Sequence, residues 1–355
     1  MSDWIRLARP DVGEAELAAV GEVVRTGQLT MGPKVEEFEA GVARAVGTAH
    51  AAAVSSGTAA LHLSLLALQI GPGDEVIVPA YTFPATANAV ELCGARAVLV
   101  DIDPDTFVVD PAAVAAAVTS KTRAVMAVHL FGRPVDWEAL QTAVPQEVVL
   151  IEDAAGALGA RYRGTACGAL GVMGCLSFHP RKIVTTGEGG AVTTDEAQLD
   201  AAVRRLRHHG WVTPGDMPAP GFNYRLPDLL CAIGIPQLAR LEQLLAARER
   251  VAAWYAERLE HFVLIPSAAE GDRHGWQAYV VQLDRRDEAL AALRAAGIEA
   301  QIGTWALHLL EPYRAQGVFP AADRAFERAL ALPFATTTTE EEVQRVATVL
   351  VGFVS

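Results

Sequence analysis

Short apolar segments alternate with helical patterns between residues 50 and 155, and this alternation constrains the fold more than any other feature. Segments such as DEVIVPA (74–80), RAVLVDID (96–103) and EVVLIEDA (147–154) are apolar almost throughout, and helical patterns separate them. Strands without a polar face are typical of a mostly parallel sheet that helices cover on both sides. We therefore predict an α/β fold with such a sheet at its centre.

The pattern changes near residue 240. A helical run covers residues 227–259, and beyond it WQAYVVQLD (276–284) alternates like a strand and is followed by helical patterns at 286–297 and 339–353. Pro236 lies inside the long run, where proline kinks or breaks a helix. We predict a large domain of residues 1–239 and a smaller C-terminal α+β domain of residues 240–355.

Charge and cysteine content narrow the possible partners. The chain has 355 residues and a net charge of −13, which disfavours binding to nucleic acid or to an anionic membrane. Neither a charged and apolar leader nor a run of 18 apolar residues is present. The four cysteines are scattered, so we expect no metal site, no disulfide framework and a cytoplasmic location.

Ligands of an open parallel sheet bind at the carboxyl ends of its strands, so the residues that follow each strand are site candidates. Gly57 and Thr58, in SSGTAAL (55–61), begin a helix whose free N–H groups suit a phosphate, although such residues are also ordinary helix caps. Phe83 follows the next strand, where an aromatic ring either stacks on a flat ligand or packs in the core.

Acidic and basic residues follow two later strands. Asp153 ends an apolar run, where a buried carboxylate needs a cation such as a protonated ring nitrogen, or else caps the next segment. Ser177 and Lys182 lie in SFHPRKIVTTGEGGAV (177–192); Lys182 is either a solvated side chain or a near-buried amine nucleophile with a lowered pKa. Phosphate site, stacking ring, acid and amine together are the requirements of pyridoxal 5′-phosphate, which we predict as cofactor.

Several of these segments resemble the DegT/DnrJ/EryC1/StrS family of pyridoxal-phosphate-dependent sugar aminotransferases, which have the aspartate aminotransferase fold (fold type I). The resemblance runs over nearly the whole chain, and its most specific pieces are SFHP-x-K with TTGEGG, and GFNYR (221–225). It implies that an amino group moves from an amino acid, L-glutamate by analogy, to a nucleotide-linked keto-sugar. It also implies a homodimer with active sites at the subunit interface and a place in polysaccharide biosynthesis.

The resemblance assigns roles to individual residues. Lys182 would form the Schiff base and move the proton, and Asp153 would pair with the ring nitrogen. The remaining assignments are Gly57, Thr58 and Ser177 to the phosphate, Phe83 to the ring face, Asn223 to the phosphate of the neighbouring subunit's cofactor, and Arg225 to the vicinity of that shared site. His308, in WALHLLEPY (305–313), is a weaker substrate candidate, for which ordinary packing is the alternative.

One position, Gly156, departs from the family pattern. Many relatives carry glutamine or another polar residue where this chain has Gly156, and that side chain can contact the ring oxygen of the cofactor.

The residues of this chain disfavour three alternative functions. A sugar dehydratase is disfavoured, because the dehydratase relatives replace the catalytic lysine, usually with histidine. A regulatory protein without turnover is disfavoured by the complete set of Lys182, Asp153, Ser177 and Asn223. Cysteine desulfuration would need a mobile reactive cysteine, and none of the four looks suited to that role.

Overall fold

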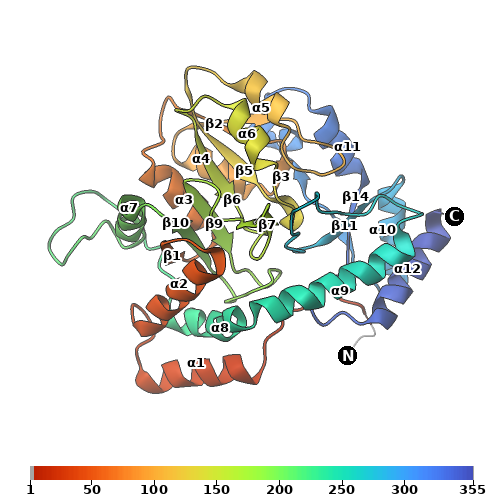
Figure 1. The fold of residues 1–355 in the computed structure, drawn as a ribbon, viewed down its shortest axis with the longest axis horizontal. Coiled ribbons are helices and arrows are strands. Elements are labelled where there is room, and N and C mark those ends of the chain that lie inside the picture. The colour runs from red at the N-terminus through yellow and green to blue at the C-terminus, as the bar shows by residue number, and fades with distance from the viewer. Residues whose placement is uncertain (1–3, 355) are drawn as a thin grey trace.

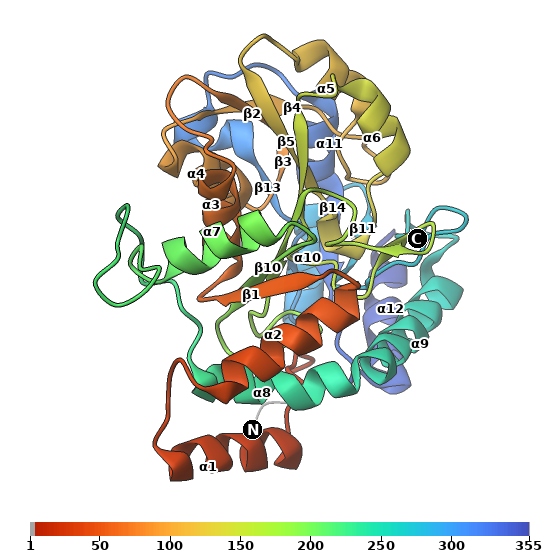
Figure 2. The same cartoon turned by 60° about the vertical axis from the view of Figure 1, so that its left-hand side comes forward.

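The computed structural model describes residues 4–354, and its centre is a seven-stranded sheet with helices on both faces (Figures 1 and 2). The strand order is β1-β10-β9-β6-β5-β2-β4, and β10 runs antiparallel to both of its neighbours while the other strands are parallel. The strands are β1 (His50–Val54), β2 (Glu75–Pro79), β4 (Arg96–Val100), β5 (Thr122–Val128), β6 (Val149–Asp153), β9 (Met173–Ser177) and β10 (Gly190–Thr194). The predicted α/β fold with a mostly parallel sheet is confirmed.

Two layers of helices cover this sheet. One face carries α3 (Gly57–Ala67), α4 (Ala85–Leu92) and α7 (Ala197–Arg207), and the other carries α2 (Pro33–Val46), α5 (Pro111–Ala117) and α6 (Trp137–Ala143). Further elements are α1 (Glu14–Thr26), β3 (Tyr81–Thr82), β7 (Arg161–Tyr162), β8 (Thr165–Ala166), β13 (Trp305–Ala306) and three short 3₁₀ turns at 130–132, 307–309 and 311–313.

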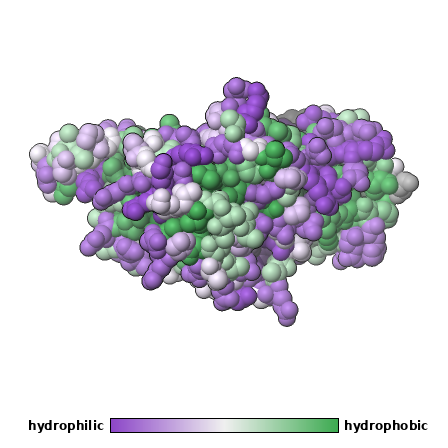
Figure 3. Space-filling view, turned by 90° about the horizontal axis from the view of Figure 1, so that it is seen from above, coloured by the Kyte–Doolittle hydropathy of each residue, from purple (hydrophilic) through white to green (hydrophobic). Residues whose placement is uncertain are grey.

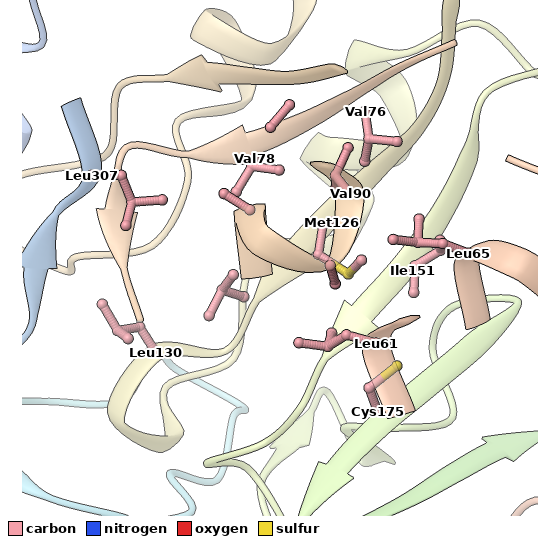
Figure 4. Close-up of a cluster of buried hydrophobic side chains, with 14 of the residues drawn as sticks. Leu61, Leu65, Val76, Val78, Val90, Met126, Leu130, Ile151, Cys175 and Leu307 are labelled. Atoms are coloured by element: carbon pink, nitrogen blue, oxygen red, sulfur yellow. The ribbon is translucent and has the colours of Figure 1, made fainter. Parts of the chain in front are cut away.

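The core between the sheet and the α3–α4 layer is apolar and fully packed (Figure 4). Leu61 and Leu65 of α3 and Val90 of α4 lie against Met126 of β5 and Ile151 of β6, and all five are buried. Successive side chains of a strand point to opposite faces of a sheet. Asp153, two positions after Ile151 and at the end of β6, therefore points toward α3 and α4, on the same face of the sheet as Ile151.

The long helical run is broken, but not where we predicted. Pro236 lies inside α8 (Asp228–Ala239), and the chain turns by 67° between this helix and α9 (Leu241–Leu259). A break at Pro236 is therefore wrong, whereas a kink there stays a prediction; the bend lies at Arg240, whose backbone is not helical (φ −112°, ψ 19°). The guanidinium of Arg240 bonds to Asp11 at 2.9 Å and to Glu16 at 3.1 Å, which ties the bend to the N-terminal segment.

A second, antiparallel sheet follows in the order β11-β14-β12, with α9, α10 (Arg286–Ala295) and α12 (Glu340–Val354) around a core of its own. Its strands are β11 (Tyr279–Gln282), β12 (Gln301–Ile302) and β14 (Ala329–Leu332). The sequence reading missed β14 and α11 (Pro320–Arg328), which precedes it. The predicted boundary at 239/240 falls at the bend between α8 and α9; the division into two domains stays a prediction.

Figure 3 shows one face of the molecule, on which apolar residues gather between hydrophilic ones. Over the whole described surface, large apolar side chains that are exposed include Leu17, Val24, Leu29, Met31 and Trp211. Within residues 4–354 no single helix is long and apolar enough to cross a membrane; the bent pair α8 and α9 meets the length and composition criteria only when taken together.

Candidate active site

Lys182 lies in the connection between β9 and β10 and is partly buried. Burial lowers the pKa of its amine to about 8, and the positive charges of Arg248 and Arg181 act in the same direction. Asp153 opposes this shift, so the two groups are close enough to interact electrostatically. An amine in these surroundings is not the freely solvated lysine that was the alternative, and the nucleophile assignment stays a prediction.

Asp153 ends β6 and is only 6% exposed. The hydroxyl of Thr86 donates to its Oδ2 at 2.8 Å, and the N–H of Ala155 donates to its Oδ1 at 3.2 Å. Burial raises the pKa of this carboxyl group, although both hydrogen bonds oppose the rise. Within residues 4–354 no basic side chain forms an ion pair with Asp153, so a protonated ring nitrogen fits the need of this carboxylate.

The N-terminus of α3 and Ser177 face each other at the carboxyl end of the sheet. Ser56 is the helix cap, since its Oγ accepts the N–H of Ala59 at 3.1 Å. In the described part of the chain, the N–H groups of Gly57 and Thr58 have no protein acceptor and remain available to an anion. A Cβ on Gly57 would lie 2.9 Å from the Cβ of Ser177, so glycine lets the helix start approach this serine. The arrangement fits a phosphate group.

Phe83 connects β3 to α4 and is 61% exposed. The core-packing alternative for this residue is therefore wrong, and its ring is free to contact a ligand. Its assignment to the face of the cofactor ring stays a prediction.

The neighbouring acid, Glu152, is bound quite differently because it points to the opposite face of the sheet. Its carboxylate accepts N–H groups of Gly168 at 2.6 Å, Leu170 at 2.7 Å and Gly171 at 2.8 Å. His129 Nε2 lies 2.9 Å from the same carboxylate, and Cys167 lies close to both. Backbone donors already hold Glu152, so this buried trio anchors the loop between β8 and β9.

Asn223 and Arg225 lie on the chain between α7 and α8. Asn223 is exposed, and Arg225 forms a backbone bridge with Val54 at the end of β1. The Nη1 of Arg225 donates to Nδ1 of His208 at 2.7 Å; burial and this charge lower the pKa of His208. The segment thus runs beside the turn that leads into α3, and its reach to a neighbouring subunit stays a prediction.

His308 is buried, and its surroundings favour the packing alternative. Its Nε2 lies 2.8 Å from Oδ1 of Asp323, and its ring centroid is 5.0 Å from that of Phe319. Strand β13, just before it, pairs with β3, so His308 follows a strand close to the site but contacts the α11 region. Its role toward substrate stays a prediction.

A model of the DegT/DnrJ/EryC1/StrS aminotransferase family matches residues 10–351. The chain belongs to this family.

Individual relatives extend over nearly the whole chain. The GDP-perosamine synthase of Caulobacter vibrioides is 41% identical and covers 99% of this chain and 99% of its own. The DesV structure from S. venezuelae, solved in complex with a ketimine intermediate, has a TM-score of 0.92 at 35% identity and covers 96% of this chain and 94% of its own. A Streptococcus pneumoniae protein in its PLP form has a TM-score of 0.94 at 29% identity, with 98% coverage of each chain.

Family membership confirms the fold, the aminotransferase activity and the cofactor that the sequence predicted. Pyridoxal 5′-phosphate fits the residues that this aminotransferase brings together: a buried carboxylate that pairs with no basic side chain of residues 4–354, a helix start with free N–H groups beside a serine, and a partly buried amine. Thr86, which holds the carboxylate, was missed by the sequence reading, because nothing local in PAYTFPATANAV (79–90) shows which of its hydroxyls faces β6.

Proposed function

We propose that this aminotransferase moves an amino group from L-glutamate to a keto-sugar carried on a nucleoside diphosphate, and that Lys182 is the amine that binds the cofactor covalently. The observation that carries the proposal is that Asp153 ends β6 and the segment of Lys182 follows the neighbouring parallel strand β9, where Asp153 is buried and its charge acts on the amine. The relative named GDP-perosamine synthase supports a nucleotide-linked sugar as acceptor, because the match covers 99% of both chains.

When bound, pyridoxal phosphate supplies the electron sink for amino transfer. Ser177 and the N–H groups of Gly57 and Thr58 would hold the phosphate, and Phe83 would contact the ring. Asp153 would keep the ring nitrogen protonated through its negative charge. Because burial brings the free base of Lys182 within reach near neutral pH, its Nζ takes the proton from the α-carbon of the donor.

We further propose a homodimer in which Asn223 and Arg225 contribute to the site of the neighbouring subunit. Leu29 and Met31 are exposed apolar side chains, and Met31 Sδ lies 3.7 Å from Arg225 Nη1, so apolar surface borders the charged segment. Such a mixture of apolar surface and arginine is frequent at subunit interfaces.

We also propose that the enzyme works in the cytoplasm, in a pathway that makes polysaccharide precursors. The proposed compartment is supported by the free thiols, which suit a reducing environment: Cys93, Cys167, Cys175 and Cys231.

The test follows both halves of the transfer. Purified holoenzyme is mixed with L-glutamate, and the visible absorbance of the bound cofactor is expected to disappear as the amino form accumulates. Keto-sugar nucleotides are then added singly, and mass spectrometry is expected to find one that gains the amino group. The matched control is Lys182→Ala, in which neither change should occur. A product that has lost water without gaining nitrogen would instead indicate a dehydratase, and an unchanged spectrum would contradict glutamate as donor.

A further inference from the structure

The side chain of Gln277 fills the space that a side chain at position 156 would occupy, in the loop that follows Asp153. A Cβ on Gly156 would lie 3.3 Å from Cγ and 3.4 Å from Oε1 of Gln277. The backbone of Gly156 does not have a positive φ, so its conformation is open to other residues. The glycine is therefore explained by the close approach of the glutamine side chain.

The backbone of Gln277 is fixed, whereas its amide is uncommitted. Its N–H donates to the carbonyl of Phe131 at 3.0 Å, and its own carbonyl accepts Nη1 of the buried Arg248 at 2.9 Å. Within residues 4–354 the side-chain amide of Gln277, which is half-buried, has no hydrogen-bond partner. A half-buried amide held at its base but free at its tip is suited to bind a ligand.

The surroundings of Gln277 are those of the active site. The N–H of Ala155, directly before Gly156, donates to Asp153, so the loop that contains Gly156 also holds the carboxylate proposed to bind the ring nitrogen. On the other side, Arg248 contacts Gln277 and is near enough to Lys182 to influence its pKa. Gln277, in the segment before β11, thus places its side chain against Gly156, three residues after Asp153, while its backbone binds Arg248, whose charge acts on Lys182.

We propose that the side-chain amide of Gln277 is a further cofactor-binding group, which donates a hydrogen bond to the ring oxygen of pyridoxal phosphate. The inference rests on the proposed attachment of the cofactor to Lys182. This oxygen is the hydroxyl substituent on the ring carbon next to the one that carries the reactive carbonyl. Gln277 thereby supplies, from the second sheet, the amide that the chain lacks at Gly156.

The test measures the pH at which the visible absorbance of the bound cofactor changes. Gln277→Met keeps the length of the side chain and removes the donor. A donor to the ring oxygen favours its anionic form, so the midpoint is expected to rise by about one pH unit. Weaker retention of the cofactor, by roughly tenfold, should accompany the shift. Gln141→Met, at an exposed glutamine of α6, is the matched control and should leave both values unchanged.

A second variant tests whether the two positions share one space. Gly156→Gln combined with Gln277→Ala offers an amide from the opposite side, and the midpoint is expected to return toward that of the wild type. An unchanged midpoint in Gln277→Met would overturn the inference, as would a shift that the combined variant does not reverse. If the wild type itself lacks a visible band that depends on Lys182, the proposed function fails first; a normal band with no effect of Gln277 refutes this inference alone.

Discussion

The hydroxyl of Thr86 donates a hydrogen bond to Asp153 at 2.8 Å, and both side chains are buried. Thr82 Oγ1 lies 3.2 Å from Thr86 Oγ1, so a second hydroxyl stands behind the first. A hydroxyl has one proton, and when Thr86 gives it to the carboxylate, Thr82 can donate to Thr86. Two hydroxyls in series therefore favour the ionised form of an acid whose pKa burial raises.

Replacing Thr86 by valine should shift the acid limb of the profile of kcat against pH to a higher pH. Valine has nearly the same shape but no donor, so the pKa of Asp153 rises further and its ionised form is lost at a higher pH. The limb is expected to move by about one pH unit, the equivalent of one hydrogen bond to a charged group. The measurement is kcat against pH, with Thr86→Ser as the control that keeps the donor. Superimposable acid limbs for the valine and wild-type enzymes would contradict this role.

Asp153→Asn should keep the fold and lose most of the turnover. The asparagine is close in shape: its oxygen can accept the N–H of Ala155 and its NH2 group can donate to the hydroxyl of Thr86, but it has no charge to hold a proton on the ring nitrogen. A fall in kcat of at least a hundredfold is expected, which corresponds to about 3 kcal/mol of transition-state stabilisation. The rate of the first half-reaction with glutamate, measured by rapid mixing, checks this prediction. A thermal unfolding temperature equal to that of the wild type is the control for correct folding. Near-normal turnover would show that the reaction does not need the negative charge of Asp153.

Chemical labelling should identify Lys182 among the three lysines of the chain. Borohydride reduces a lysine–cofactor linkage to a stable amine, and peptide mapping then locates the cofactor. The label is expected on Lys182, and Lys34 and Lys121 are internal controls, since Lys34 pairs at the surface with Glu37 and Lys121 is exposed. Lys182→Ala should give no label and lose several orders of magnitude in turnover. A label on either other lysine would refute the assignment.

The lowered pKa of Lys182 predicts a pH-dependent stability of the cofactor-free protein. The amine changes from an unfolded pKa of 10.5 to about 8, so its protonation opposes folding at every pH below 8. This penalty should fade as the pH rises from 8 to 10.5, where both states become neutral. Lys182→Met should therefore be more stable than the wild type at pH 7 by roughly 2 kcal/mol, after allowance for partial exposure. Urea unfolding at several pH values checks the trend, and a gap that does not narrow above pH 8 would contradict it.

The sheet and the acid, serine and lysine of the site were predictable because they depend on local patterns. Strands buried on both faces are apolar along their whole length, and the polar residue after each strand marks the edge where ligands bind. Asp153, Ser177 and Lys182 were proposed in this way, and their roles stay predictions.

Residues that act across the fold were not predictable in the same way. Thr86 lies 67 positions from Asp153, and Gln277 approaches Gly156 only when the second sheet is in place. Arg240, at the bend between α8 and α9, likewise pairs with the distant Asp11 and Glu16, whereas the local pattern pointed to Pro236. A local pattern shows which residues are unusual but not which distant side chain meets them.

The exposed Asn223 leaves open which subunit's site it serves. The backbone bridge between Val54 and Arg225 lies beside the start of α3 in the same chain, while the exposed side chain of Asn223 is free to reach a neighbour. The two arrangements differ in what a mixed dimer can do, because a shared site takes Lys182 from one subunit and Asn223 from the other.

Complementation distinguishes the two arrangements. Lys182→Ala and the double variant Asn223→Ala, Arg225→Ala are each expected to be nearly inactive and are mixed in equal amounts. With shared sites, a mixed dimer has one site with both lesions and one with neither. Random exchange makes half of the dimers mixed, so roughly a quarter of wild-type activity should return. If Asn223 serves its own subunit, every site of a mixed dimer carries one lesion and nothing returns. Mass spectrometry of the intact dimers is the control that exchange occurred, and mixed dimers without recovered activity would refute the shared site.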